Sequence, residues 1–143
     1  RAAQGQWLDA DLGATAQPWK VLGHHMPAYS SCTTHGSDED LRELWSTVAE
    51  RHGVQVDFTG HNHNYERSVP LNGGLEVLPG EGTVYVVSAG AGADLYGNDM
   101  GQPFTEVAAV TEHYVIATID GDTMEVVARD LAGNEIDRFT VPR

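Results

Sequence analysis

Two histidines one residue apart, His61 and His63, stand in the stretch Gly-His-Asn-His-Asn-Tyr-Glu-Arg at residues 60–67. The preceding residues 54–58 alternate between apolar and polar side chains, which predicts a buried strand that ends just before the histidines. Neutral imidazole is a common ligand of Zn²⁺ and related cations. Residues i and i+2 of an extended segment share a face at roughly 6–7 Å, which is wide for one ion but suits two ions about 3.5–4 Å apart that each take one histidine. The spacing therefore predicts a two-metal site at the end of a strand.

A second pair of histidines, His24 and His25, follows another short apolar segment at residues 19–22. Pro27 cannot continue a central strand, so both histidines lie where a strand passes into a loop. A further histidine, His35, lies in the loop that follows. Because open α/β sheets bind ligands at the carboxyl ends of their strands, this arrangement favours a site built from several strand ends.

The composition is that of an ordinary globular domain, with 41% hydrophobic and 20% charged residues in a chain of 143. A net charge of −13 argues against a nucleic-acid partner, whose phosphates would be repelled. No apolar run approaches the ~20 residues of a membrane span, which argues against a membrane partner. The single cysteine, Cys32, excludes an internal disulfide. No initiator methionine or targeting segment stands at Arg1, so we expect the chain to be an interior part of a longer protein.

The order of the expected elements indicates a mixed α/β fold, with three strands in the first half, two of them separated by a helix, and then an antiparallel meander. The second helix should begin with Ser37 as its N-cap and carry acidic residues 38–40 in its first turn. Residues 93–109 should form a long surface loop. The expected elements are a helix at 4–12, a strand at 19–22, a helix at 38–52, strands at 54–58 and 82–88, hairpins at 68–78 and 114–128, and a last strand at 135–141.

Three stretches taken together resemble the calcineurin-like metallophosphoesterases and, within them, the purple acid phosphatase-like branch. They are Gln-Trp-Leu at 6–8 with Pro-Trp at 18–19, Gly-His-His-Met-Pro-Ala-Tyr-Ser-Ser at 23–31, and the motif at 60–67. The resemblance covers nearly all of residues 1–143, as a single domain that is the C-terminal portion of the family's catalytic domain. It implies half of a β-sandwich flanked by helices and, for the parent protein, metal-dependent hydrolysis of phosphate esters.

The same resemblance assigns roles to the histidines. By position, His61 would bind the second, divalent ion and His63 the first ion, which is iron in the purple enzymes and is paired with Zn, Mn or Fe. The family's His-x-Pro-x-Tyr-Ser pattern selects His25 as the partner of His61, whereas its Gly-His pattern selects His24; we favour His25. His35 matches a family histidine that assists the leaving group or holds the phosphate, and as imidazolium it could protonate the departing alkoxide. A solvated loop histidine is the alternative for His35.

The residues that complete the motif, Asn64, Tyr65, Glu66 and Arg67, are predicted to orient the ligands, because a metal-bound imidazole usually bonds a partner through its other nitrogen. Ordinary packing and surface pairing are the alternative for them. The family's remaining ligands come from Asp-containing, Gly-Asp-x-x-Tyr and Gly-Asn-His motifs that this chain lacks. The resemblance therefore implies at most partial metal occupancy in this chain.

Half of a sandwich should expose apolar surface, so we expect as a partner either the N-terminal half of the same domain or a second copy of the chain. The alternative to a contribution to catalysis is a catalytically silent chain that binds a single divalent metal or a partner chain. Family analogy implies an extracellular or periplasmic location.

Overall fold

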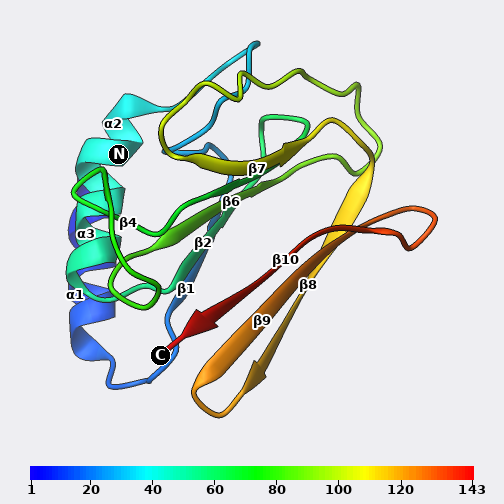
Figure 1. The fold of residues 1–143 in the computed structure, drawn as a ribbon. Helices are drawn as coiled ribbons and strands as arrows, with labels where there is room; N and C mark the ends of the chain where they lie inside the picture. The colour runs from blue at the N-terminus through cyan, green and yellow to red at the C-terminus, as the bar shows by residue number, and fades with distance from the viewer.

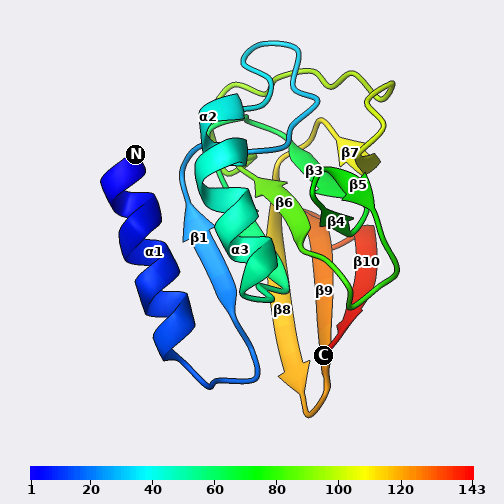
Figure 2. The same ribbon diagram turned by 90° about the vertical axis from the view of Figure 1, so that its left-hand side faces the viewer.

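The computed structural model describes all residues 1–143 and shows two β-sheets that face each other, with helices on the outer side of the larger sheet (Figure 1 and Figure 2). The expected mixed α/β fold with an antiparallel meander is confirmed. The larger sheet has the order β1-β2-β6-β3-β7 and the smaller sheet the order β10-β9-β8. The strands are β1 (Val21–His24), β2 (Val56–Thr59), β3 (Tyr65–Ser68), β4 (Leu71–Asn72), β5 (Leu75–Glu76), β6 (Val84–Ser88), β7 (Thr105–Ala109), β8 (His113–Asp120), β9 (Thr123–Asp130) and β10 (Glu135–Pro142).

The parallel strands β1, β2 and β6 bring three strand ends to one edge of the larger sheet. β1 pairs with β2, and β2 with β6, in parallel, whereas β3 joins β6 in the antiparallel direction. His25 directly follows β1, residues 60–64 follow β2, and the loop of residues 89–104 follows β6. The histidine motifs therefore leave the sheet side by side.

The core between the two sheets follows the alternation of the strands. On β9, Met124 and Val126 point inward and are almost fully buried. They pack in one cluster with Val56 of β2 and Val86 of β6, which are fully buried. A shift of register by one residue would turn this whole apolar face toward water, so burial of the face determines the pairing.

Helices cover the opposite face of the larger sheet (Figure 2). Leu12 of the first helix packs with Val48 of the last helix and with Val54, which precedes β2. None of the helices combines the length and the apolar character needed to cross a membrane. The helical elements are α1 (Ala2–Ala14), α2 (Glu39–Leu41), a π-helical turn η1 (Arg42–Ser46) and α3 (Thr47–Arg51).

Two of the expected local details are wrong. The carboxylate of Asp38, and not the hydroxyl of Ser37, caps helix α2, because it accepts the backbone N–H of Leu41 at 3.1 Å. The hydroxyl of Ser37 instead donates to the carbonyl of Ser30 at 3.2 Å. The region expected to be a loop at 93–109 also contains β7, a short strand that pairs with β3 through a shifted register and has little alternation of its own.

The two sheets leave different kinds of edge on their two sides (Figure 2). On one side, β7 carries a charged residue, and β10 carries several charges, a register shift and Pro142. On the other side, β1 has no Asp, Glu, Lys, Arg or Pro, and β8 has a regular register, one charge at its last residue, Asp120, and exposed Tyr114, Ile116 and Ile119. Charges, proline and bulges are how natural edge strands avoid further pairing. A groove of about 540 Å³ separates the two unprotected edges and is lined by residues such as His24 and Val115.

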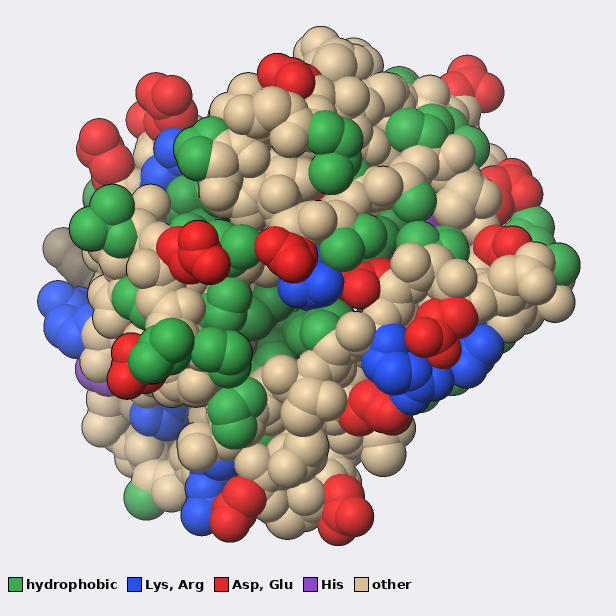
Figure 3. All heavy atoms as spheres, in the orientation of Figure 1, with side chains coloured by type: hydrophobic (Ala, Val, Ile, Leu, Met, Phe, Trp, Pro, Cys, Tyr) green, Lys and Arg blue, Asp and Glu red, His purple; other side chains and the backbone are tan.

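The face shown in Figure 3 carries a second hollow, in which hydrophobic side chains gather between the β4–β5 hairpin and β10. Its lining includes Val77, Leu78 and Phe139, and its volume is about 330 Å³. Arg67 reaches this hollow from β3, and its guanidinium lies 4.8 Å from the centre of the Phe139 ring.

Candidate metal centre

The loop after β2 turns sharply at His61, which has a φ of 64°. The expectation of an extended Gly-His-Asn-His segment is therefore wrong. A histidine in this left-handed region costs about 1–2 kcal/mol, and such strain is typical of functional sites. The turn sends both histidines outward and both asparagines inward, since His61 and His63 are half-buried while Asn62 and Asn64 are fully buried.

The structure brings His25, and not His24, to His61. The Nε2 atom of His25 lies 3.2 Å from Nδ1 of His61, with ring centres 5.0 Å apart. His24 faces the helices, where its ring meets Trp45 edge-on at 5.1 Å and its Nε2 atom lies 3.0 Å from the carboxylate of Asp57. The Asp57 side chain is only 3% exposed, so His24 is occupied as the partner of a buried charge.

The distance between His25 and His61 fits two ligands of one ion. Two imidazole nitrogens on a tetrahedral zinc lie about 3.3 Å apart, given zinc–nitrogen bonds of about 2.0–2.1 Å. In the structure the two nitrogens are within hydrogen-bond distance of each other. Burial lowers the pKa of His61 from its ordinary value, and the neighbouring histidines His35, His25 and His63 add to this effect. A neutral imidazole keeps the lone pair that a metal requires.

His63 has the arrangement of a ligand with an oriented ring. Its Nδ1 atom donates to the backbone carbonyl of Asp94 at 2.8 Å, which leaves Nε2 as the free nitrogen. Its ring stacks on Tyr96 with centres 4.4 Å apart and planes 14° apart. Asp94 could not be found from the sequence, because its contact with His63 is made by its backbone carbonyl. Tyr96 could have been suspected only as an aromatic residue in a loop.

His35 lies between the two halves of the centre. Its ring is 4.6 Å from that of His61 and 5.4 Å from that of Tyr96. His25, His61, His35, Tyr96 and His63 thus form one continuous row of rings, with neighbouring centres 4.4 to 5.4 Å apart. No group of three or more His, Cys, Asp or Glu side chains in the chain is placed to hold a metal ion. The donors therefore fit a metal site in type and spacing, but not in number.

Comparison with known proteins also indicates a metallophosphoesterase fold. No protein-family model matches the chain. It is 32% identical over 123 residues to the Fe(3+)-Zn(2+) purple acid phosphatase 12 of Arabidopsis thaliana, an alignment that covers 76% of this chain and 26% of that protein. The fold matches purple acid phosphatase PPD1 from yellow lupin (Lupinus luteus) seeds with a TM-score of 0.83 and 26% identity, over 98% of this chain and 28% of that one. The chain belongs to the purple acid phosphatase branch of the calcineurin-like phosphoesterases.

The fold is shared more widely than the sequence. The structure of PhoD matches with a TM-score of 0.62 and 17% identity, over 99% of this chain and 31% of PhoD. The chain spans about a quarter of the length of its purple acid phosphatase relatives. The family is one of phosphatases, as the sequence predicted.

Tyr65 and Arg67 of the purple acid phosphatase-like motif bond a carboxylate of the other sheet and make no hydrogen bond with the imidazoles. Tyr65 donates its hydroxyl to Asp137 at 2.8 Å, and Nε of Arg67 donates to the same carboxylate at 2.6 Å. Burial, followed by the charge of Asp137 and its hydrogen bond, raises the pKa of Tyr65. Burial alone would lower the pKa of Arg67, but the hydrogen bond and charge of Asp137 outweigh it and raise that pKa. This trio joins the two sheets.

The side chains of Glu66, Asn62 and Asn64 stabilise the loops that carry His35 and His63. The buried Glu66 carboxylate accepts the backbone N–H of Ser31 at 2.8 Å and the hydroxyl of Ser30 at 3.1 Å. Nδ2 of Asn62 donates to the Ser30 hydroxyl at 2.7 Å and to the carbonyl of Gly36 at 2.9 Å. Both contacts fix the loop that holds His35, while Nδ2 of Asn64 reaches the carbonyl of Tyr96 at 3.4 Å.

Proposed function

We propose that the protein to which this chain contributes hydrolyses phosphate esters with a pair of metal ions. His25 and His61 would hold the divalent ion, His63 would hold the other ion, and His35 would act on the leaving group. The observation that carries the proposal is the 3.2 Å approach of His25 to His61 with the His35 ring beside them. The name of the Arabidopsis relative supports Fe³⁺ with Zn²⁺, and Mn or a second Fe are the other expected pairs.

The residues of the chain divide the work as follows. When bound, the ions supply positive charge that neutralises the phosphate and acidifies water. Three neutral imidazole nitrogens would bind the ions. They are the free Nε2 of His63, Nε2 of His25 and Nδ1 of His61. The ring nitrogens of His35 have no hydrogen bond within the chain, so its imidazolium can pass a proton to the departing oxygen.

We also expect an extracellular or periplasmic location, by analogy with the family.

The coding sequence upstream of Arg1 and the activity of the chain together test this proposal. We expect the upstream region to encode the Gly-Asp-x-x-Tyr and Gly-Asn-His motifs, and their absence there would refute the enzymatic proposal. The 143 residues alone should hydrolyse an aryl phosphate negligibly with added Fe, Zn or Mn, because no three donors come together. Robust turnover by these residues that disappears in His63→Ala would show that the chain needs no further ligands.

A catalytically silent chain that binds one divalent ion or a partner chain is the second candidate. The unprotected edges β1 and β8 favour a partner, because both lie on the same side and expose apolar residues. The groove between them contains Gly60, the residue before His61, so a partner seated there would reach the metal centre. The partner would be the N-terminal half of the same domain or, failing that, a second copy.

Self-association of the chain through β8 can be measured directly. Ile119 is 50% exposed and lies on the same face of β8 as Val115 and Ala117, which line the groove, and burying such a side chain contributes about 1.5–3 kcal/mol. Ile119→Lys should therefore raise the dissociation constant of the dimer about tenfold or more, as followed by light scattering over a concentration series. Thr140→Lys on the protected edge β10 is the matched control and should change nothing. A wild-type chain that stays monomeric throughout would exclude the second copy as a partner.

A further inference from the structure

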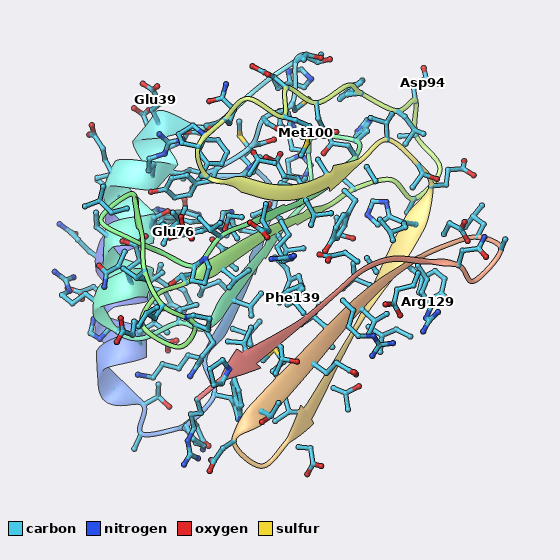
Figure 4. The ribbon with its side chains drawn as sticks, viewed as in Figure 1. Glu39, Glu76, Asp94, Met100, Arg129 and Phe139 are labelled. Carbon is cyan, nitrogen blue, oxygen red and sulfur yellow. The ribbon has the colours of Figure 1, made fainter.

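Tyr96 lies between the two histidines to which the proposed function gives different tasks. It belongs to the loop between β6 and β7. Asp94 and Met100 of this loop lie at the same end of the molecule as Glu39 (Figure 4). One face of the Tyr96 ring stacks on His63 at 4.4 Å, and its ring meets that of His35 at 67° and 5.4 Å. Its hydroxyl makes no hydrogen bond with the chain, so the contacts of the side chain are those of the ring.

The backbone around Tyr96 is tied to the His63 segment. The N–H of Tyr96 donates to the carbonyl of His63 at 2.9 Å, and its own carbonyl accepts Nδ2 of Asn64 at 3.4 Å. Two residues earlier, the carbonyl of Asp94 accepts Nδ1 of His63 at 2.8 Å. The His63 ring is thus held both by a hydrogen bond in its plane and by a stacked ring on its face.

The residues that follow Tyr96 are tied to the loop that carries His35. Thr33 donates two hydrogen bonds to the carbonyl of Gly97, one from its backbone N–H at 2.9 Å and one from its hydroxyl at 3.2 Å. The N–H of Asp99 donates to the carbonyl of Ser31 at 2.8 Å. The segment 94–99 therefore links the His63 loop to the His35 loop, and the Tyr96 ring contacts both histidine rings.

We infer that Tyr96 is a positioning residue, whose ring fixes the plane of His63 and its placement relative to His35. This rests on the proposed function for the tasks of the two histidines, but the positioning itself does not need a metal. Groups that orient a metal-bound histidine typically change metal affinity 10- to 100-fold when removed. The ring, and not the hydroxyl, carries this role, so phenylalanine should replace tyrosine and leucine should not.

The test is NMR of the 143-residue chain with ¹⁵N-labelled histidine, as wild type, Tyr96→Phe and Tyr96→Leu. In the wild type we expect His63 as the Nδ1–H tautomer, with ring-current shifts on both His63 and His35. Tyr96→Phe should keep all three signatures. Tyr96→Leu should lose the shifts on both histidines and mix the tautomers of His63. The buried His113, bonded to Ser88 at 3.1 Å, reports that each variant is folded.

A Zn²⁺ titration of the same samples separates this inference from the proposed function. Tyr96→Leu should raise the apparent dissociation constant at His63 about tenfold, and Tyr96→Phe by less than about twofold. Tyr114→Leu, which removes a half-exposed tyrosine on β8, is the matched control and should have no effect. Unchanged His63 and His35 signals in Tyr96→Leu, or equal losses in Tyr96→Phe, would overturn the inference. Wild-type His63 signals that ignore Zn²⁺ would show that these 143 residues alone do not hold an ion at His63, which agrees with the absence of three converging donors, and the tautomer result would then decide the positioning.

Discussion

In the whole protein to which this chain contributes, His25→Ala is expected to lower the affinity for Zn²⁺ by more than about 100-fold. A direct ligand matters more than the groups that orient it, whose removal typically costs about 10- to 100-fold. His25 Nε2 faces His61 Nδ1 at 3.2 Å and has no other partner. His24→Gln should leave the affinity within about threefold, since His24 faces Asp57 on the helix side of the sheet. Isothermal titration with Zn²⁺, at equal folded fraction by circular dichroism, measures both effects.

The two neighbouring histidines should also differ in what they do to stability. His24→Ala leaves the buried Asp57 carboxylate without a partner, which typically costs about 3–5 kcal/mol in the free energy of unfolding. His24→Gln is the gentler variant for the metal experiment, because its amide can still donate to Asp57. A loss of Zn²⁺ affinity in His24→Gln equal to that in His25→Ala would show that the ligand has been assigned to the wrong histidine.

Asp137→Ala should lower the free energy of unfolding by about 3–5 kcal/mol, because it leaves the Arg67 guanidinium partly buried without its counter-charge. The two side chains are only 14% and 7% exposed, and the fully buried Tyr65 loses its hydrogen-bond acceptor at the same time. Urea denaturation followed by circular dichroism gives the difference.

An exposed ion pair provides the comparison for this prediction. Asp122 lies 2.7 Å from Arg143 but is 73% exposed, so Asp122→Ala should cost less than about 1 kcal/mol. The double variant Asp137→Leu with Arg67→Leu should recover part of the loss, because no unpaired charge is then buried. A loss below about 1 kcal/mol in Asp137→Ala would mean that the carboxylate is not what joins the sheets.

Much of the fold followed from short-range patterns in the sequence. The alternation at 54–58 and at 114–128 predicted strands that the structure contains, and the family resemblance is confirmed by the purple acid phosphatase relatives. Strand β7 was not predicted, because its pairing with β3 is a long-range contact and its five residues show little alternation between buried and exposed side chains. That residues 1–143 form one domain, and the C-terminal portion of a larger one, stays a prediction.

The site was predicted in its residue types but not in its internal bonding. The choice between His24 and His25 needed the position of Asp57, which lies on the neighbouring strand. The bonding of Tyr65 and Arg67 to Asp137 could not be predicted, because alternate residues of a strand share a face and the sequence does not say which residue of the other sheet that face meets. The hydrogen-bond partner of His63 is the backbone carbonyl of Asp94, and every residue has such a carbonyl, so the residue type does not predict the contact.

The left-handed backbone at His61 also has a consequence for how this site could be lost. Among ordinary residues, asparagine, aspartate and histidine visit that region most readily, and glycine does so without strain, whereas β-branched residues strongly resist it. Asparagine at this position would keep the course of the loop and remove only the imidazole. Relatives that abandon metal chemistry while retaining the fold should therefore carry asparagine or glycine here, and valine or isoleucine should be the replacements that selection rejects.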